Sequence, residues 1–301
     1  MHIPVLFAET LEALEIKAGG RYVDGTLGRG GHTRGMLARG AEVLGIDRDD
    51  EAVAEMKAAK LAGLTVVKGN HGDLEQIAKS HGWSEADGVL LDLGVSSPQL
   101  DEADRGFSFM REGPLDMRMD RRAELTAEEM VNEWDAAELE KTLRELGEEP
   151  QAGKIVRAIV KARAAKRIES TLELAELVER AIGRRGARHP ATRTFQALRM
   201  RVNDELGELK RALEGGLNLL KPGGRMAVIT FESLSDRTVK RFFAEHVGRN
   251  VSLQAGGSKW EGALPKVKAI THKAVTATPA ETEANPRARS AKLRAAEKER
   301  I

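Results

Sequence analysis

The chain contains no cysteine and few aromatic residues. Its 301 residues include three tryptophans, one tyrosine and seven phenylalanines, so aromatics make up 4% of the total. The absence of cysteine excludes disulfides, thiol nucleophiles and thiolate metal sites. The few aromatics argue against a platform on which successive bases of a single strand would stack. The seven histidines show neither metal-ligand spacing nor a Ser-His-Asp arrangement.

Long hydrophobic runs are also absent. Residues 1–14 lack a basic leader region, and Glu9 and Glu12 interrupt their hydrophobicity. No later run approaches the roughly 20 apolar residues that a membrane helix requires. We therefore expect a cytoplasmic protein with no membrane partner. The sequence indicates no oligomeric state.

The most informative stretch that is present is residues 24–47, DGTLGRGGHTRGMLARGAEVLGID. A short apolar strand ends at Asp24, a glycine-rich turn follows, a helix is expected at 33–38 and a second strand at 42–46. Asp47, at the end of that strand, can accept hydrogen bonds from two ribose hydroxyls. The loop N–H groups would face the other end of the ligand. The pattern predicts a nucleoside pocket, although a tight turn in any α/β protein is the simpler alternative.

The spacing of this loop bears on which nucleoside it would bind. A dinucleotide-binding loop has G-x-G-x-x-G directly after its strand, whereas here Asp24 intervenes and the glycines run G-x-G-G. Asp24 would repel a pyrophosphate but would attract a cation, and S-adenosylmethionine (SAM) carries an ammonium and a sulfonium. The loop therefore favours SAM over a nicotinamide cofactor and its oxidoreductases. His32 either contacts the ligand or merely begins the helix, and the residues leave both open.

Strands and helices alternate as far as the apolar run GVLLD at 88–92, and then the alternation stops. Helical periodicity fills 124–146, 151–165, 171–182 and 192–213, and strand character returns at 225–231 and near 267–275. We expect a Rossmann-like, doubly wound α/β sheet of the SAM-dependent methyltransferase kind with an all-helical insertion. The sheet domain would comprise 1–104 and 202–301, and the insertion, 105–201, would overhang the pocket and present the substrate.

The net charge of +1 conceals a segregation of charge along the chain. Acids predominate from 101 to 149 and bases from 154 to 201. Such asymmetry suggests a basic face for phosphates, because each neutralised phosphate releases counterions. For 161–167 alone a solvated helical face is the better interpretation. The segment 183–189, GRRGARH, is loop-like, so helix solvation does not explain its arginines.

Residues 92–120 begin where the fourth strand ends, beside the proposed pocket. Ser96-Ser97-Pro98-Gln99 resembles the polar-Pro-Pro-aromatic motif of enzymes that methylate exocyclic amines. Gln99 stands where an aromatic would stack on a flipped base, so Phe107 or Phe109 would have to stack instead. Core packing explains either phenylalanine equally well. Asp92 is a ligand contact or a strand-end cap, and its position favours the contact.

An exocyclic amine conjugated to a pyrimidine ring is a poor nucleophile because its lone pair is delocalised. Methyl transfer to it depends mainly on holding nitrogen, methyl and sulfur in line. The enzyme should also accept hydrogen bonds from the amine as positive charge develops. No metal is needed for this. Ser97, Pro98 and Asp92 are the candidates that position the amine.

Together these motifs resemble the bacterial RsmH (MraW) family, which methylates a cytidine of small-subunit ribosomal RNA at N4. The likeness spans nearly the whole chain, from HIPVLFAE through YVDGTLGRGGHT, GIDRD, DGVLLDLGVSSPQLDEADRGFSFMREGPLDMRMD and HPATRTFQALRMRVNDEL to LKPGGRMAVITF, SDRTVKRFF and NPRARSAKLRAAEK. It implies SAM as cofactor and, as partner, 16S rRNA in the decoding region of an assembled or nearly assembled small subunit. The SAM contacts that it implies are Gly30, Gly31, His32, Asp47, His71, Asp92 and Gln99.

The chain departs from the family pattern at two places. His71 stands where an aromatic is common and can still lie flat against adenine. The segment usually reading FHSLEDR is FESLSDR, with Glu232 in place of the histidine and Ser235 in place of the glutamate. No role is carried over to Glu232, and this leaves open a second class of function, a non-catalytic assembly factor that binds SAM.

RNA recognition should rest on phosphates and shape because aromatics are scarce. The expected contacts in the insertion are Arg184, Arg185, Arg188 and Arg193. In the tail they are Arg287, Arg289, Lys292 and Arg294, for which a disordered basic end is the alternative.

Overall fold

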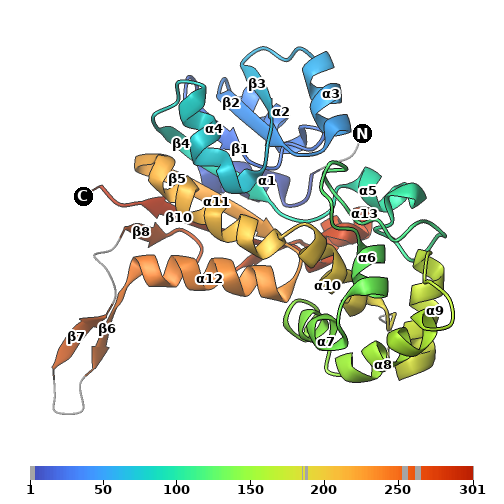
Figure 1. Ribbon diagram of the computed structural model, residues 1–301. Coiled ribbons are helices and arrows are strands. Elements are labelled where there is room, and N and C mark those ends of the chain that lie inside the picture. Colours follow the sequence, from blue (N-terminus) through green and yellow to red (C-terminus); the bar gives the residue numbers. More distant parts are fainter. Residues whose placement is uncertain (1–3, 185, 187–188, 253–256, 262–265, 301) are drawn as a thin grey trace. The chain divides into compact units, whose positions relative to one another are not determined.

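The computed structural model describes residues 4–184, 186, 189–252, 257–261 and 266–300. The chain divides into two compact units, one of Met1–Gly94 with Gly207–Ile301 and one of Val95–Leu206 (Figure 1). The second unit contains the expected insertion, 105–201, and extends beyond it on both sides. One reason is Asn203, whose side chain bonds the Met119 N–H at 2.8 Å and the Met117 carbonyl at 2.7 Å within this unit.

The first unit is built on an eight-stranded sheet with the order β3-β2-β1-β4-β5-β10-β8, and β9 pairs with β10. Strands β1 to β5 are parallel, and β10 runs antiparallel to β5. The order 3-2-1-4-5, which reverses between β1 and β4, is that of a doubly wound sheet, so the Rossmann-like expectation is confirmed. The strands are β1 (Arg21–Asp24), β2 (Glu42–Asp47), β3 (Leu64–Lys68), β4 (Ala86–Asp92), β5 (Leu220–Thr230), β8 (Val267–Ala269), β9 (Val275–Thr276) and β10 (Lys292–Lys298).

The helices of the first unit bury the sheet, which explains why β4 reads as a continuous apolar run. Val89, Leu90 and Leu91 are at most 1% exposed, and α1 supplies Leu11 and Leu14 to a core shared with β1, β4, β5 and β10. The helices are α1 (Phe7–Leu14), α2 (Gly31–Leu37), α3 (Asp50–Ala58), α4 (Leu74–Ser80), α11 (Glu205–Leu219), α12 (Ser233–Val247) and α13 (Pro279–Ala284). A two-stranded sheet, β6 (Arg249–Ser252) with β7 (Ser258–Glu261), stands apart from the main one.

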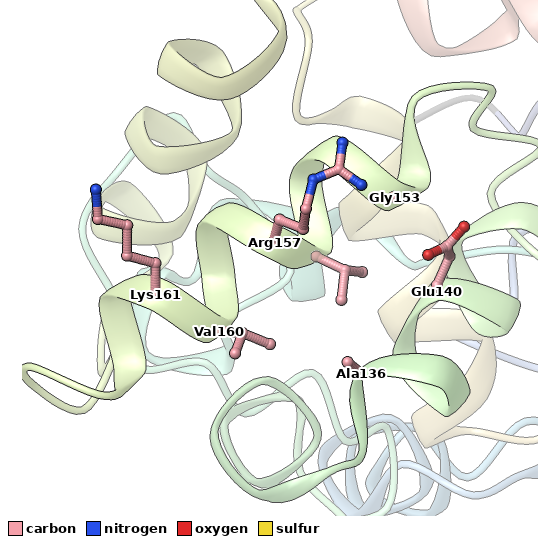
Figure 2. A pocket seen from close by; sticks show the side chains of 7 residues that line it. Ala136, Glu140, Gly153, Arg157, Val160 and Lys161 are labelled. Atoms are coloured by element: carbon pink, nitrogen blue, oxygen red, sulfur yellow. The ribbon is translucent and has the colours of Figure 1, made fainter.

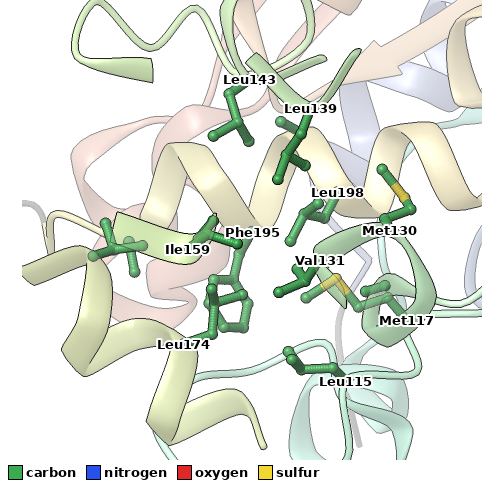
Figure 3. Packing of buried hydrophobic residues seen from close by; sticks show 14 of the residues in the cluster. Leu115, Met117, Met130, Val131, Leu139, Leu143, Ile159, Leu174, Phe195 and Leu198 are labelled. Atoms are coloured by element: carbon green, nitrogen blue, oxygen red, sulfur yellow. The ribbon is translucent and has the colours of Figure 1, made fainter. Parts of the chain in front are cut away.

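The second unit is helical and has its own core (Figure 3). Leu115, Val131, Leu139, Ile159 and Leu198 are all completely buried in it. Its helices are α5 (Ser97–Asp101), α6 (Ala127–Glu133), α7 (Ala136–Glu145), α8 (Ala152–Arg163), α9 (Thr171–Ile182) and α10 (Thr192–Val202). The amphipathic periodicity of the sequence therefore corresponds to helices that each bury one face.

Two helices expected from the periodicity are interrupted. The expected helix 124–146 is α6 and α7, separated where Trp134 and Asp135 are extended. The expected helix 192–213 ends with α10, and α11 begins after Asp204, which has a left-handed φ of 44°. At the second break the Asn203 side chain donates to the Arg199 carbonyl at 2.9 Å, and hydrophobic periodicity does not register such local hydrogen bonds.

The basic C-terminal segment is a strand rather than a disordered end. β10 lies between β5 and β8 and buries Leu293, Ala295 and Ala296. Arg294 bonds Asp236 of α12 at 2.6 Å, and Lys292 bonds the same carboxylate at 3.1 Å. These two cations are therefore already partnered inside the first unit.

Across the ranges that the structure describes, no helix is both long enough and apolar enough to cross a membrane.

Candidate functional site

Three aspartates end three neighbouring parallel strands of the first unit. Asp24 ends β1, Asp47 ends β2 and Asp92 ends β4. Asp24 pairs in register with Gly45 on one side and Leu90 on the other, so the three acids lie at the same edge of the sheet. This edge, beside the β1/β4 reversal, is where open α/β sheets bind their ligands.

Asp24 is held inside the protein by the glycine turn and by α2. The Thr33 hydroxyl donates to its carboxylate at 2.7 Å and the Thr26 N–H at 3.1 Å. Only 2% of the residue is exposed. The pKa of Asp24 is raised to about 6, mainly by burial. The hydrogen bonds from Thr33 and Thr26 lower it, and the nearby Asp47 carboxylate raises it.

Asp92 lacks the compensation that Asp24 has. Its backbone N–H donates to the Thr26 hydroxyl at 2.6 Å, but its Oδ1 is buried and has no hydrogen-bond partner in the protein. Burial, followed by repulsion from Asp24, raises the pKa of Asp92 to about 7. The side chain of Asp92 is 26% exposed overall, so the two acids form one negative region that a ligand can reach and that a cationic group would stabilise.

His32 lies in the first turn of α2 and is only 5% exposed. Its Nε2 is 3.1 Å from the Val5 carbonyl, which can only accept, so Nε2 carries the proton. Its Nδ1 is 3.6 Å from Oδ2 of Asp92. Burial lowers the pKa of His32 to about 4, so this contact joins a neutral imidazole to the carboxyl group and is not an ion pair at neutral pH.

The glycines of the turn meet steric demands. Gly30 has φ +72°, and a Cβ there would collide with the side chain of Met56. A Cβ on Gly31 would collide with Pro4. The backbone at these positions therefore approaches its neighbours more closely than any side chain would allow.

Asp47 fastens this turn to the sheet. Its Oδ2 accepts the Gly28 N–H at 2.7 Å, and its Oδ1 accepts the Asp49 N–H at 2.9 Å. Burial raises the pKa of Asp47, whereas these hydrogen bonds lower it. A carboxylate offers about four acceptor positions, so two stay available for ribose hydroxyls. The sequence pattern predicted only a ligand role for Asp47 and gave no sign of its role as an anchor.

His71 follows β3 in a short 3-10 turn and is 8% exposed. Its Nε2 is buried without a hydrogen-bond partner in the protein. Burial, with the nearby Arg48 and Arg211 guanidinium groups, lowers the pKa of His71 to about 3, so the ring is neutral. Glu208 of α11 fixes the turn by accepting the Gly72 N–H at 3.1 Å. No sequence signal pointed to Glu208, which is 136 residues from Gly72.

This donor set fits SAM. A buried carboxyl oxygen of Asp92 and a buried ring nitrogen of His71 are both unpaired. Two acids with raised pKa values suit a ligand with cationic groups, and the acceptors of Asp47 suit a ribose. Groups of three or more metal-ligating side chains do not occur among the residues that the structure describes.

The other candidates for cofactor and amine contacts belong to the second unit. Gln99 is 6% exposed, and its Oε1 accepts the Ser96 N–H at 3.0 Å. Ser97 and Pro98 begin α5, and their side chains lie outside the described part of the chain.

The two phenylalanines considered for stacking pack inside the second unit. Phe107 is 7% exposed in its core. Phe109 lies 4.7 Å from the His189 ring and 4.9 Å from the Phe195 ring. These contacts favour the core-packing alternative for both.

Of the four arginines expected to bind RNA, Arg184 follows α9 and Arg193 lies in the first turn of α10. Arg184 pairs with Glu179 at 2.9 Å, but its side chain is 63% exposed, so the guanidinium is still accessible. Arg185 and Arg188 lie outside the described residues.

Comparison with known proteins extends the similarity over the whole chain. The model of the MraW methylase family matches residues 1–299. Proteins named ribosomal RNA small subunit methyltransferase H are 48% identical in Parvibaculum lavamentivorans (99% of this chain and 89% of the relative), 47% in Symbiobacterium thermophilum (98% and 95%) and 50% in Nitratidesulfovibrio vulgaris (99% and 95%). The chain therefore belongs to the MraW methylase family.

Proposed function

We propose that this protein methylates small-subunit ribosomal RNA and that its target is the exocyclic N4 of a cytidine in the decoding region of 16S rRNA, within the small subunit. The observation that carries the proposal is the match to the methylase family and to relatives named for small-subunit rRNA methylation over at least 98% of the chain. The cofactor is SAM. The acidic pair Asp24 and Asp92 supports a cationic donor and argues against the pyrophosphate of a nicotinamide cofactor.

Different residues contact different parts of SAM in this proposal. SAM supplies a methyl group activated by a positive sulfur. Asp24 and Asp92 stabilise the cationic end, Asp47 accepts hydrogen bonds from the ribose, and His71 lies against the adenine. Gln99 remains a predicted cofactor contact.

Ser97 and Pro98 position the amine, and Asp92 accepts a hydrogen bond from it. Their contribution is alignment and acceptance of a developing positive charge, which suits a weakly nucleophilic nitrogen.

Incubation with labelled SAM and small subunits from a methylation-deficient strain tests the reaction. We expect N4-methylcytidine on nucleoside analysis of the 16S rRNA. If SAM binds but no label enters the rRNA, the result favours a non-catalytic assembly factor. If the label appears on another nucleoside, the proposed target atom is wrong.

Replacement of His71 tests its place against the adenine. Because the ring is neutral and would contribute stacking, His71→Phe should keep SAM affinity within a few-fold, and His71→Ala should lower it about tenfold, as stacking contributes about 1–3 kcal/mol. Titration calorimetry measures both. Equal losses in the two variants would show that the ring nitrogens matter rather than the ring face.

The arginines after α9 should contribute to RNA affinity through phosphates. Arg184, Arg185 and Arg188 changed together to alanine should weaken rRNA binding and lower the slope of log affinity against log salt by about 0.7–0.9 for each phosphate that is no longer neutralised. SAM affinity should not change. An unaltered slope would mean that these arginines face solvent.

A further inference from the structure

Helix α8 of the second unit carries positive charge only. Its sequence, AGKIVRAIVKAR, contains four cations and no acidic residue. Lys154, Arg157 and Lys161 are spaced i, i+3 and i+7, so they lie on one face of the helix, and all three are exposed. We call these three residues the α8 stripe.

The rest of the basic run differs from the stripe. Arg163 donates to the Val131 carbonyl at 2.9 Å, and Arg167 pairs with Glu128 at 2.7 Å and Glu133 at 2.8 Å. The sequence suggested that 161–167 is a solvated helical face. Arg163 and Arg167 are not simply solvated, because both bind partners within the unit. That interpretation does not account for Lys161.

Two residues of the α8 stripe, Arg157 and Lys161, border a groove of about 410 Å³ between α7 and α8. Its apolar lining is Ala136, Val156 and Val160, and Arg157 and Lys161 lie on its rim (Figure 2). The figure shows these two side chains extending on the same side of α8.

The groove has an excess of positive charge. Its single acidic lining residue, Glu140, is bound by Arg144 at 2.6 Å. Within the described ranges, neither Arg157 nor Lys161 makes an ion pair or a side-chain hydrogen bond. Two cations without internal partners thus border a groove whose own carboxylate is already neutralised.

We propose that the α8 stripe and its groove bind the sugar–phosphate backbone of the ribosomal RNA substrate, as a second phosphate-binding surface besides Arg184–Arg193. The inference rests on the proposed function for its substrate. Arginine binds phosphate through two parallel hydrogen bonds and lysine as a point charge, and both fit a polyanion. The lining offers no aromatic ring and no uncharged hydrogen-bonding side chain, so this surface holds the backbone and does not read bases.

The test compares Arg157→Ala/Lys161→Ala with the charge-matched control Lys166→Ala/Lys210→Ala, which removes two exposed cations that do not line the groove. Binding to protein-free 16S rRNA is measured between about 50 and 200 mM salt. The groove variant should bind about tenfold more weakly, with a slope lower by about 1.4–1.8, as expected when two phosphates are no longer neutralised. The control should keep the wild-type slope. Both variants should retain the wild-type melting temperature and SAM affinity.

The methylation assay separates this proposal from the proposed function. On small subunits the groove variant should show a raised KM and an unchanged kcat. If the wild-type protein transfers no methyl group, the proposed function fails, but the salt slope on protein-free rRNA still decides the α8 stripe. A slope equal to that of the control overturns the stripe proposal. If only binding to whole subunits is weakened, the groove holds a ribosomal protein, and that result also overturns it.

Discussion

Asp92→Asn should weaken SAM binding at least tenfold and, at the same time, raise the thermal stability of the ligand-free protein at pH 8. Both effects have one cause. The Oδ1 atom of Asp92 is buried without a partner, and Asp24 repels its charge. Asparagine keeps the shape of the side chain but removes its negative charge. A cationic ligand then binds more weakly, and the ligand-free protein no longer has to hold an unpaired charge.

The sign of the stability effect follows from the pKa of about 7 for Asp92 in the folded protein. This value lies above the ordinary one of about 3.9, so folding favours the protonated form. The stabilisation is complete below about pH 4 and is lost as the pH rises to about 7. The gain in melting temperature for Asp92→Asn should therefore be larger at pH 8 than at pH 5, by roughly 2–4 °C for each kcal/mol relieved. An identical gain at both pH values would contradict the pKa assignment.

The same titration predicts the pH dependence of binding. Asp24 and Asp92, with pKa values of about 6 and about 7, should lose protons when a cation binds. SAM affinity should rise between pH 5.5 and 8, and protons should be released near pH 6.5. Calorimetry in two buffers with different ionisation enthalpies measures the release. Asp92→Asn should flatten the profile.

Asp87→Asn is the matched control, because Asp87 lies at the other end of the same strand. Burial raises the pKa of Asp87, but an ion pair with Lys221 and the Arg21 N–H, at 3.0 Å, lower it overall. Here the charge stabilises the fold. Asp87→Asn should lower the melting temperature and leave SAM affinity intact, which is the opposite of the result expected for Asp92→Asn.

Asp47→Ala should reduce SAM affinity about a hundredfold or more. Hydrogen bonds to a charged group contribute about 1.5–3 kcal/mol each, and two ribose hydroxyls would lose their acceptor. The variant should still fold, although with a lower melting temperature, because Asp47 also fixes the turn through the N–H groups of Gly28 and Asp49. Calorimetry and thermal unfolding measure the two losses separately.

A ligand change separates the two roles of Asp47. The 2′-deoxy analogue of S-adenosylhomocysteine lacks one hydroxyl that Asp47 would bind. Wild-type protein should bind it more weakly than the parent compound, and Asp47→Ala should bind both compounds equally. If the losses from the mutation and from the missing hydroxyl add, Asp47 acts on the loop and not on the ribose.

The parallel part of the doubly wound sheet was predictable because its strands leave local signals. The apolar run at 88–92, the glycine turn after Asp24 and the acid at Asp47 are all visible within short windows of sequence. β10 was missed because its basic residues suggested a solvated tail, whereas Asp236, more than fifty residues earlier in the chain, partners Arg294 and Lys292. Pairing over such separations is not a local property.

The sequence predicted where the site residues lie along the chain, but it did not predict their hydrogen bonds or pKa values. The glycine turn and the apolar runs place Asp24, Asp47 and Asp92 at strand ends, but they do not tell which carboxylate has hydrogen-bond donors. Asp24 has two hydrogen-bond donors, whereas one oxygen of Asp92 has none. That difference arises from packing, and it separates their pKa values.

The order of charged residues in the sequence also did not show which basic side chains have partners in the folded protein. The run 154–167 reads as uniformly basic, but Arg167 reaches back to Glu128 and Glu133, and Arg163 is tied to a carbonyl. Only the folded helices separate these residues from Arg157 and Lys161, which border the α7/α8 groove.

A crystal structure of the protein with SAM bound tests the central claim most directly. The account predicts that SAM lies at the carboxyl ends of β1, β2 and β4, with its ribose on Asp47, its adenine against His71 and its cationic end facing Asp24 and Asp92. SAM bound elsewhere, or bound here with its cationic end turned away from both aspartates, would contradict it.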